Sequence, residues 1–328
     1  MDVSLQIMAQ KLKEHSAYKI YYHEKPDGDA VMSAYALAVA LQSIGISCEP
    51  LCCDGIPDAY KEEISTLSYQ PLKADPVEFT NIAVDTAKNK RLGKYKDEEI
   101  TFCIDHHEHT DKDDNDDGMK AKYKWVVPEA SSCAELIYKL ILEMGIKVNP
   151  EIASLLYIGL ITDTLCFRTF ATNKESLETA ALLAGRGADI VRIARQYALE
   201  KTPERVAVEQ VLIDSFHFTC NGKVLSAMIT YEDLHNMGIE DTRLEGLKIV
   251  VDQIRGPEIG IVVHETSKGH CRVSVRTYKG INAVDICREF GGGGHHDRAG
   301  FETDEKPEVI IRQVEETAER YLKSKSKS

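Results

Sequence analysis

The chain has 328 residues, of which 43% are hydrophobic, and its formal net charge is −13 at pH 7. The composition is ordinary for a globular protein, and the length suffices for two domains. The acidic balance argues against a broad basic face for long duplex nucleic acid. No apolar run reaches the roughly 20 residues that span a bilayer, and the first residues form no secretory leader. We therefore expect a cytoplasmic protein that does not contact membranes.

Strands and helices alternate in the first half of the sequence. Ser4 can cap a first helix, in which Leu5, Met8 and Leu12 share one face. Further helices are expected at about 30–45, 131–144, 150–161, 174–185 and 189–200, and strands at 19–23, 46–53, 81–85 and 100–105. This alternation predicts an α/β domain with a mainly parallel sheet and helices on both faces.

A second, smaller α/β domain is predicted after a change of pattern near residue 200. Thr202 and Pro203 suit the cap and the first position of a helix. Beyond it we expect strands at 216–219, 224–230, 258–265 and 271–277, and helices at 244–254, at 283–289 and from 307 onward. The predicted organisation is a catalytic domain over 1–198, a linker over 199–210, a substrate-binding domain over 211–322 and a disordered tail over 323–328. The active site is expected in the cleft between the two domains.

Acidic residues and histidines follow several of the short apolar runs in the first half. They are His23, Asp27-Gly28-Asp29, Asp85, Asp105-His106-His107 and Asp163. The carboxyl ends of parallel strands meet at one edge of a sheet, so these side chains are expected to gather there. Carboxylates and imidazoles without thiolates suit hard or borderline divalent cations. A pair of such cations is a common device for displacement at phosphorus.

Each piece has a simpler interpretation when it stands alone. Asp27-Gly28-Asp29 is usually a turn, in which the glycine tolerates unusual backbone angles. The acidic run 111–118 is best interpreted as a solvated surface loop, because Lys124 stands where a calcium loop needs glutamate. The nine cysteines contain no CxxC spacing and are interpreted as structural. Only the combination of the acidic pieces makes a metal site the preferred interpretation.

Taken in this order, the acidic pieces resemble the motifs of the DHH phosphoesterases. Gly291 to Gly294, followed by His295 and Ala299-Gly300, resembles the signature of the DHHA1 domain that accompanies DHH in nanoRNases, pAp phosphatases and RecJ-like exonucleases. The resemblance covers about residues 17–302. The most similar subgroup is the stand-alone NrnA-like bifunctional oligoribonucleases and pAp phosphatases.

The resemblance implies two divalent cations, with Mn²⁺ expected and Mg²⁺, Co²⁺ or Fe²⁺ as alternatives. It implies terminal ligands for one ion at His23 and Asp27, and a bridging ligand at Asp85. The other ion would be held by Asp29, His106 and Asp163. His107 would face the phosphoryl group, while Asp105 would orient a histidine.

On the substrate side, the resemblance implies contacts from the second domain. These are expected from Arg276, Gly292, Gly293, Gly294, His295 and Arg298. The glycines would let backbone N–H groups approach a phosphate, although a glycine run alone is more often a linker. Arg298 departs from the family pattern, which has a small residue there, so both a phosphate contact and a solvent-facing position remain open. Ser132 and Glu135 favour a helix cap, and Arg168 could pair with a carboxylate or reach substrate.

The preferred function is two-metal hydrolysis of phosphoester bonds in RNA or DNA oligonucleotides of two to five residues, in 3′-phosphoadenosine 5′-phosphate (pAp), or in both. Alternatives within the superfamily are a phosphodiesterase for pApA, a product of cyclic dinucleotides, and a single-strand exonuclease. Pyrophosphate ranks lower, because the glycine run does not belong to those enzymes. An alternative of another class is a non-catalytic nucleotide-binding protein. A homodimer is left open.

Overall fold

The computed structural model describes residues 1–71, 78–107, 118–239, 249–294 and 296–325. Its contacts divide the chain into two compact units, Met1–Glu200 and Lys201–Ser328. Each unit has its own hydrophobic core. The cleft between the domains stays a prediction.

The first unit is built around a five-stranded parallel sheet with the strand order β2-β1-β3-β4-β5. Its elements are, in chain order, α1 (Leu5–Leu12), β1 (Ala17–Tyr21), α2 (Gly28–Gln42), β2 (Ser47–Leu51), α3 (Asp58–Ser65), β3 (Thr80–Val84), the 3₁₀ helix η1 (Asn89–Tyr95), β4 (Phe102–Asp105), β5 (Tyr123–Val126), α4 (Cys133–Glu143), α5 (Pro150–Asp163), α6 (Lys174–Gly185), α7 (Ile190–Ala194) and the π-helix η2 (Arg195–Leu199). The predicted mainly parallel α/β fold is confirmed.

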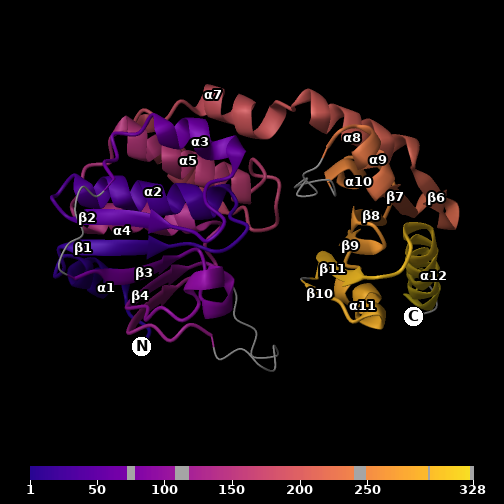
Figure 1. Ribbon diagram of the computed structural model, residues 1–328, viewed down its shortest axis with the longest axis horizontal. Coiled ribbons are helices and arrows are strands. Elements are labelled where there is room, and N and C mark those ends of the chain that lie inside the picture. Colours follow the sequence, from indigo (N-terminus) through magenta and orange to yellow (C-terminus); the bar gives the residue numbers. More distant parts are fainter. Residues whose placement is uncertain (72–77, 108–117, 240–248, 295, 326–328) are drawn as a thin grey trace. The chain divides into compact units, whose positions relative to one another are not determined.

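Helix α2 is apolar on every side because it lies between the sheet and α5. A helix that is hydrophobic all round belongs in an interior of this kind. Helices α1, α2, α4 and α5 share one large core with one face of the sheet, as Figure 1 shows for α2 and α5. The start of α2 and the end of α5 therefore lie close together.

The opposite face of the sheet has a smaller cover. In the described part of the chain it is covered by η1 and the segment around Met119, in a small core with Tyr21, Ala83 and Cys103. The connection from β3 to β4 contains only a 3₁₀ helix, so it supplies no α-helix for that face. The predicted sheet flanked by helices is thus confirmed, with a 3₁₀ helix on this face.

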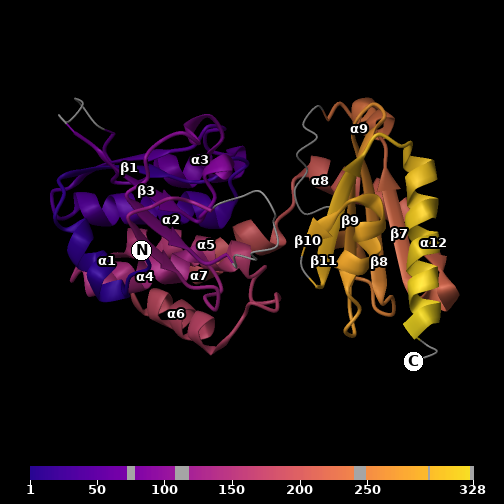
Figure 2. The same cartoon turned by 90° about the horizontal axis from the view of Figure 1, so that it is seen from below.

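The second unit contains a six-stranded mixed sheet with the order β10-β11-β9-β8-β7-β6, in which only β7 and β8 are parallel. Figure 2 shows α12 lying along β7 and β8. The elements are α8 (Pro203–Asp214), β6 (His217–Thr219), the 3₁₀ turn η3 (Cys220–Gly222), β7 (Val224–Ile229), α9 (Tyr231–Asn236), α10 (Ile249–Asp252), β8 (Ile259–Ser267), β9 (His270–Thr277), α11 (Ala283–Cys287), η4 (Arg288–Phe290), β10 (Gly293–Gly294), β11 (Arg298–Thr303) and α12 (Pro307–Lys325).

Two boundary predictions differ from the structure. Most of the predicted linker 199–210 is helical, because α8 begins at Pro203 with Thr202 as its cap and packs Val208 against the sheet. The predicted tail 323–328 is helical as far as Lys325, whose Nζ donates to the Gly280 carbonyl at 3.3 Å. No helix in the described residues is long and apolar enough to cross a membrane.

Candidate metal centre

Three neighbouring strands end at the candidate site. His23 lies two residues beyond β1, Asp85 directly follows β3, and Asp105 ends β4, with His106 and His107 after it. From β1 the chain adds β2 on one side of the sheet and then adds β3, β4 and β5 on the other side. The direction in which strands are added therefore reverses between β1 and β3. Ligands of open parallel sheets bind at the carboxyl ends of strands beside such a switch point.

Two helix ends complete the site. Asp27 caps α2, and its Oδ1 accepts from the Ala30 N–H at 3.1 Å, while Asp163 is the last residue of α5. Gly28 is the first residue of α2 and has no left-handed backbone. A Cβ at Gly28 would lie only 2.5 Å from Thr162 Oγ1. The glycine therefore serves close packing of α2 on α5, and the predicted tight turn was wrong.

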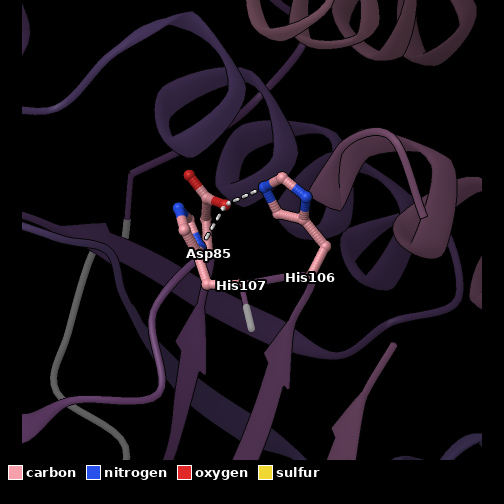
Figure 3. A group of neighbouring side chains, drawn as sticks. All are labelled: Asp85, His106 and His107. Atoms are coloured by element: carbon pink, nitrogen blue, oxygen red, sulfur yellow. Dashed lines mark ion pairs between the residues drawn. The ribbon is translucent and has the colours of Figure 1, made fainter. Parts of the chain in front are cut away.

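Asp85 lies at the centre of the cluster. Its Oδ2 is 3.5 Å from His23 Nε2, and its Oδ1 is 3.4 Å from His106 Nε2. Figure 3 shows its carboxylate directed toward His106 and His107. Asp27 Oδ1 lies 3.9 Å from His23 Nε2, and Asp163 Oδ2 lies 3.5 Å from His106 Nε2. The structure thus brings together the side chains that the sequence singled out in the first unit.

Potential ligand atoms fall into three overlapping groups, each with its atoms within 4.8 Å of one another. Two of the groups share no residue: His23 with Asp27 and Asp85, and Asp29 with His106 and Asp163. The third joins Asp85 to His106 and His107. Ligands that stand about 2.1 Å from an ion lie roughly 3 Å apart, so these separations are close to what a shared ion requires.

Asp85 has a left-handed backbone, with φ of +60°. Aspartate is one of the few residues other than glycine that adopts this conformation without severe cost. The conformation directs the carboxylate away from the line of β3 and toward the ends of β1 and β4. Strained residues of this kind concentrate at functional sites.

The histidines are oriented by backbone carbonyls. Nδ1–H of His23 donates to Glu24 O at 2.8 Å, and Nδ1–H of His106 donates to Ala130 O at 3.3 Å. A carbonyl only accepts, so the proton must be on Nδ1. In both rings Nε2 then faces the carboxylates, which is the orientation of a histidine that binds metal.

His107 is held differently, by Asp105. Its Nδ1–H donates to Asp105 Oδ1 at 2.7 Å, and the same oxygen accepts from the His106 N–H at 2.8 Å. Burial lowers the pKa of His107, but the hydrogen bond to Asp105 and the charges of Asp85 and Asp105 together outweigh it and leave the pKa raised. The His107 side chain is 42% exposed, against 12% for His106. His107 is therefore the histidine that can reach a bound molecule.

Asp29 has partners that the sequence did not reveal. Its Oδ1 accepts from Ser33 Oγ at 3.0 Å and from the Ala134 N–H at 2.9 Å, and its Oδ2 accepts from the Cys133 N–H at 2.5 Å. The two backbone donors belong to the first turn of α4, where a helix favours negative charge. Asp29 and Cys133 are 104 positions apart, and no pattern in the sequence indicates their contact. Only the contact with Ser33, four residues along the same helix, could have been expected from the spacing.

The crowded carboxylates and imidazoles shift one another's pKa values. Burial, and then the charges of Asp85 and Asp163, raise the pKa of Asp29. Burial also raises the pKa of Asp163 to about 6. Burial opposes ionisation of Asp85, but His106 and His23 outweigh it and lower the pKa of this carboxyl. Burial lowers the pKa of His106, yet Asp85 and the other carboxylates raise it to about 11.

The donor set fits divalent cations. Asp85 Oδ1 and Asp105 Oδ2 are buried and have no hydrogen-bond partner among the described residues. Protonated histidine partly balances the negative charge, a role that a cation would take over as protons leave. The set consists of carboxylate oxygens and imidazole nitrogens, the ligands that suit Mn²⁺ and Mg²⁺ together with Fe²⁺ and Co²⁺.

Other predicted residues near the site have structural contacts. Ser132 caps α4 by accepting from the Glu135 N–H at 3.2 Å, and the Glu135 carboxylate accepts from the N–H and hydroxyl of Ser131. The helix cap was thus correct, but the reciprocal bond goes to Ser131. Arg168 donates to Leu165 O at 2.6 Å.

Four of the six predicted substrate residues lie at a pocket of about 420 Å³ in the second unit. Arg276, Arg298, Gly293 and Gly294 line it. Gly292 is not among the lining residues. A Cβ there would lie 2.6 Å from the Gly300 carbonyl oxygen, so this glycine allows close packing of the backbone.

The glycine run forms less of an anion nest than expected. The N–H groups of Gly291 and Gly292 donate to Arg288 O and Cys287 O, the end of the preceding helical turn. Gly293 and Gly294 pair with β11. His295, like most of the acidic run 111–118, lies outside the described residues.

Comparison with protein families gives two matches. Residues 18–160 match the DHH family, N-terminal domain, and residues 209–323 match the DHHA1 domain. The first match contains the candidate ligands except Asp163, and the second contains the pocket.

Curated relatives align along most of the chain. A bifunctional oligoribonuclease and PAP phosphatase NrnA of Thermus thermophilus is 26% identical over 96% of this chain and 95% of its own length. A probable manganese-dependent inorganic pyrophosphatase of Streptococcus thermophilus is 25% identical over 69% of this chain and 74% of its own length. The crystal structure of an exopolyphosphatase-related protein from Bacteroides fragilis has the same fold, with a TM-score of 0.82, 20% identity and 96% of each chain covered.

Proposed function

Because the chain is a DHH-family phosphoesterase with a DHHA1 domain, we propose that it hydrolyses phosphoester bonds in short oligonucleotides of two to five residues and in pAp. Two divalent cations, with Mn²⁺ preferred, would be bound by the carboxylates and histidines at the strand ends. The similarity to proteins named oligoribonuclease and PAP phosphatase supports the substrate class.

The observation that carries the proposal is the position of Asp85 between two ligand groups. One carboxylate oxygen faces His23 and the other faces His106. An aspartate so placed can bridge two ions, each of which then has further ligands from separate elements. When bound, such a pair supplies Lewis-acid activation of water and stabilises charge that develops at phosphorus.

The chain's own residues would do the rest. Asp27, at the start of α2, and Asp163, at the end of α5, would hold their ligand positions on rigid elements. His107 is exposed, oriented by Asp105 and has a raised pKa, so it can donate a proton to the leaving oxygen or a hydrogen bond to a phosphoryl oxygen. Asp105 keeps the His107 ring oriented and stabilises its charged form.

A short substrate is consistent with the charge of the molecule. The net charge of −13 disfavours a long polyanion. A few arginines beside a pocket of about 420 Å³ suit a small anion instead.

The direct test is a substrate panel with Mn²⁺ and with chelator. The panel contains pAp, pApA, inorganic pyrophosphate, and RNA and DNA chains of two to ten residues. We expect Mn²⁺-dependent hydrolysis of pAp and of the shortest chains, with efficiency falling as chains lengthen. Equal rates on long RNA, or activity on pyrophosphate alone, would contradict the proposal. Binding without turnover at any metal concentration would support a non-catalytic nucleotide-binding protein.

The division of roles between the two adjacent histidines has its own test. His107→Ala should keep both ions and lose on the order of 10²–10⁴-fold in kcat, the range for a positioned proton donor. His106→Ala should lose one ion. Metal content measured on the purified variants separates the two outcomes, and the same metal loss in both would show that the roles are assigned wrongly.

A further inference from the structure

Left-handed backbone outside glycine is concentrated beside the candidate ligands. In the described part of the first unit it occurs at Lys25, at Asp85 and over residues 165–167, just after α5. Lys25 lies between His23 and Asp27 and has a φ of +49°. Lysine lacks the short polar side chain that lets aspartate or asparagine adopt this conformation more readily. The turn between these two candidate ligands therefore needs support from another part of the chain.

The residues before Lys25 are held by two neighbouring elements. The thiol of Cys52, which follows β2, donates to His23 O at 3.1 Å. On the other side, the Glu24 N–H donates to Arg91 O in η1 at 2.7 Å. His23 is thus fixed by contacts that do not involve Lys25.

Beyond Glu24 the support comes from Asp54, two residues after Cys52. Its Oδ2 accepts from the Lys25 N–H at 2.7 Å. Proline has no N–H to donate at position 26. Among the described residues, this is the only hydrogen bond that ties the backbone between Glu24 and Asp27 to a distant segment. Asp54 and Lys25 are both exposed, so the bond competes with water and contributes little to overall stability.

We propose that Asp54 is a positioning residue for the ion of the group formed by His23, Asp27 and Asp85. This inference rests on the proposed function, because it takes that group to hold an ion. Asp27 Oδ1 lies 3.9 Å from His23 Nε2, and the left-handed turn at Lys25 sets the direction from which Asp27 approaches. Without the bond from Asp54, the turn relaxes toward ordinary backbone angles and carries Asp27 away from His23.

The other ligand group does not depend on this turn. Asp29 lies within α2, His106 follows β4, and Asp163 ends α5. Asp29 is also tied to the backbone of α4 by its own hydrogen bonds. Loss of Asp54 should therefore weaken one ion and spare the other, a selectivity that general loss of structure does not produce.

The first experiment titrates Mn²⁺ into the full chain without substrate. In the His106→Ala background the ion of the His23 group is expected to remain. There, Asp54→Ala should weaken Mn²⁺ binding about 10- to 100-fold, the range for residues that orient metal ligands. In the Asp27→Asn background the other ion is expected to remain, and the same change should alter its affinity less than about threefold. Equal weakening in both backgrounds, or none in the first, would overturn the positioning role.

Two control variants separate position from charge. Asp54→Asn keeps a side-chain oxygen that can accept from the Lys25 N–H, so it should bind Mn²⁺ within about threefold of wild type. Asp58→Ala removes another exposed carboxylate, whose partner is Lys61 at 2.6 Å, and should leave Mn²⁺ affinity unchanged. A loss in Asp54→Asn as large as that in Asp54→Ala would show that charge and not position matters. In chelator, the melting temperature of Asp54→Ala should fall by no more than about 4 °C, and a larger fall would show a role in folding instead.

The strain at Lys25 provides a test by rescue. Asparagine adopts left-handed backbone more readily than lysine, so Lys25→Asn should make the turn less dependent on Asp54. With asparagine at position 25, Asp54→Ala should cost less than about threefold in Mn²⁺ affinity, against about 10- to 100-fold with lysine. Equal losses in the two backgrounds would show that Asp54 does not act through the turn.

Kinetics on the substrate panel separate this inference from the proposed function. In Asp54→Ala the Mn²⁺ concentration for half-maximal rate should rise about 10- to 100-fold, while kcat at saturating Mn²⁺ stays near that of wild type. Asp54-dependent Mn²⁺ binding in a protein that hydrolyses no member of the panel would reject the proposed function and leave the positioning role intact. Hydrolysis of the panel by an Asp54→Ala variant with wild-type Mn²⁺ affinity would reject the positioning role and leave the proposed function intact.

Discussion

Asp27 and Asp29 flank the same glycine, but their carboxylates have different surroundings. The Asp27 side chain is 49% exposed and makes one cap bond to α2. The Asp29 side chain is buried and accepts three hydrogen bonds, two of them from the backbone of α4. The first is therefore free to serve a ligand, while the second also joins two helices.

This difference predicts that two isosteric changes have different effects on the unfolding free energy. Asp27→Asn keeps a good helix cap, so unfolding free energy should change by less than about 0.5 kcal/mol while metal content falls. Asp29→Asn sets an amide N–H against a backbone N–H of α4, so metal-free protein should lose on the order of 1–3 kcal/mol. Relief of repulsion from Asp85 and Asp163 offsets part of that loss. Chemical denaturation in chelator measures both, and equal stability losses would contradict the assignment.

The candidate ligand set was implied by the family resemblance, and part of it was also predictable from the sequence pattern, because several of these residues follow a local apolar run. The clustering of His23, Asp85 and Asp105 could be predicted from the positions of the strand ends alone, because the carboxyl ends of parallel strands meet at one edge of a sheet. The contacts of Asp29 with Cys133 and Ala134 were not predictable, because they depend on how α4 packs against α2. The left-handed backbone of Asp85 was equally hidden, since no residue pattern near it requires a positive φ.

At the scale of elements, the site depends on how closely α2 approaches α5. Gly28 begins α2 and faces Thr162 near the end of α5. A wider separation of these helices would move Asp27 and Asp29 away from Asp163. The packing of two helices thus sets the spacing of the ligands.

Two helical glycines allow this to be tested. A Cβ at Gly28 would lie within 2.8 Å of three Thr162 atoms, whereas one at Gly185, at the end of α6, meets nothing within 4 Å. Gly28→Ala should cost about 1–3 kcal/mol by overpacking and lower metal affinity. Gly185→Ala should be neutral or stabilise by about 0.5–1 kcal/mol, the helix propensity gain. A stable, fully metal-loaded Gly28→Ala variant would show that the contact does not matter.

His264 on β8 predicts a pH dependence of stability in the second unit. The residue is buried, its Nε2 has no partner among the described residues, and burial lowers its pKa to about 4. The unfolded pKa is about 6.5, so the unfolded chain binds a proton first as pH falls. Stability is fully present above pH 6.5 and declines toward pH 4, by about 2 kcal/mol at pH 5.

Denaturation of wild type and His264→Gln at pH 7.5 and pH 5 checks this expectation. The difference between the two proteins isolates His264 from the other titrating groups. The variant should lose about 2 kcal/mol less than wild type over that interval. An identical loss in both proteins would mean that His264 is protonated in the folded state without cost.

At the scale of the whole molecule, the candidate metal centre and the arginine pocket belong to different units. The candidate ligands come from Met1–Glu200, and the pocket residues come from Lys201–Ser328. Each unit has its own core. The division into two α/β units was predictable from the pattern, and so was the start of α8 at Pro203, but the linker was placed too far along the chain, because α8 occupies most of it.

Separate cores predict that each ligand stabilises its own unit. A ligand at 100 times its Kd adds about 2.7 kcal/mol to the unit that binds it. In calorimetry, Mn²⁺ should raise the transition of the first unit and leave the other in place, while AMP should raise the transition of the second unit alone. Asp85→Asn should abolish the Mn²⁺ shift, and Arg298→Ala should abolish the AMP shift. A single transition moved by either ligand would show that the two units unfold together.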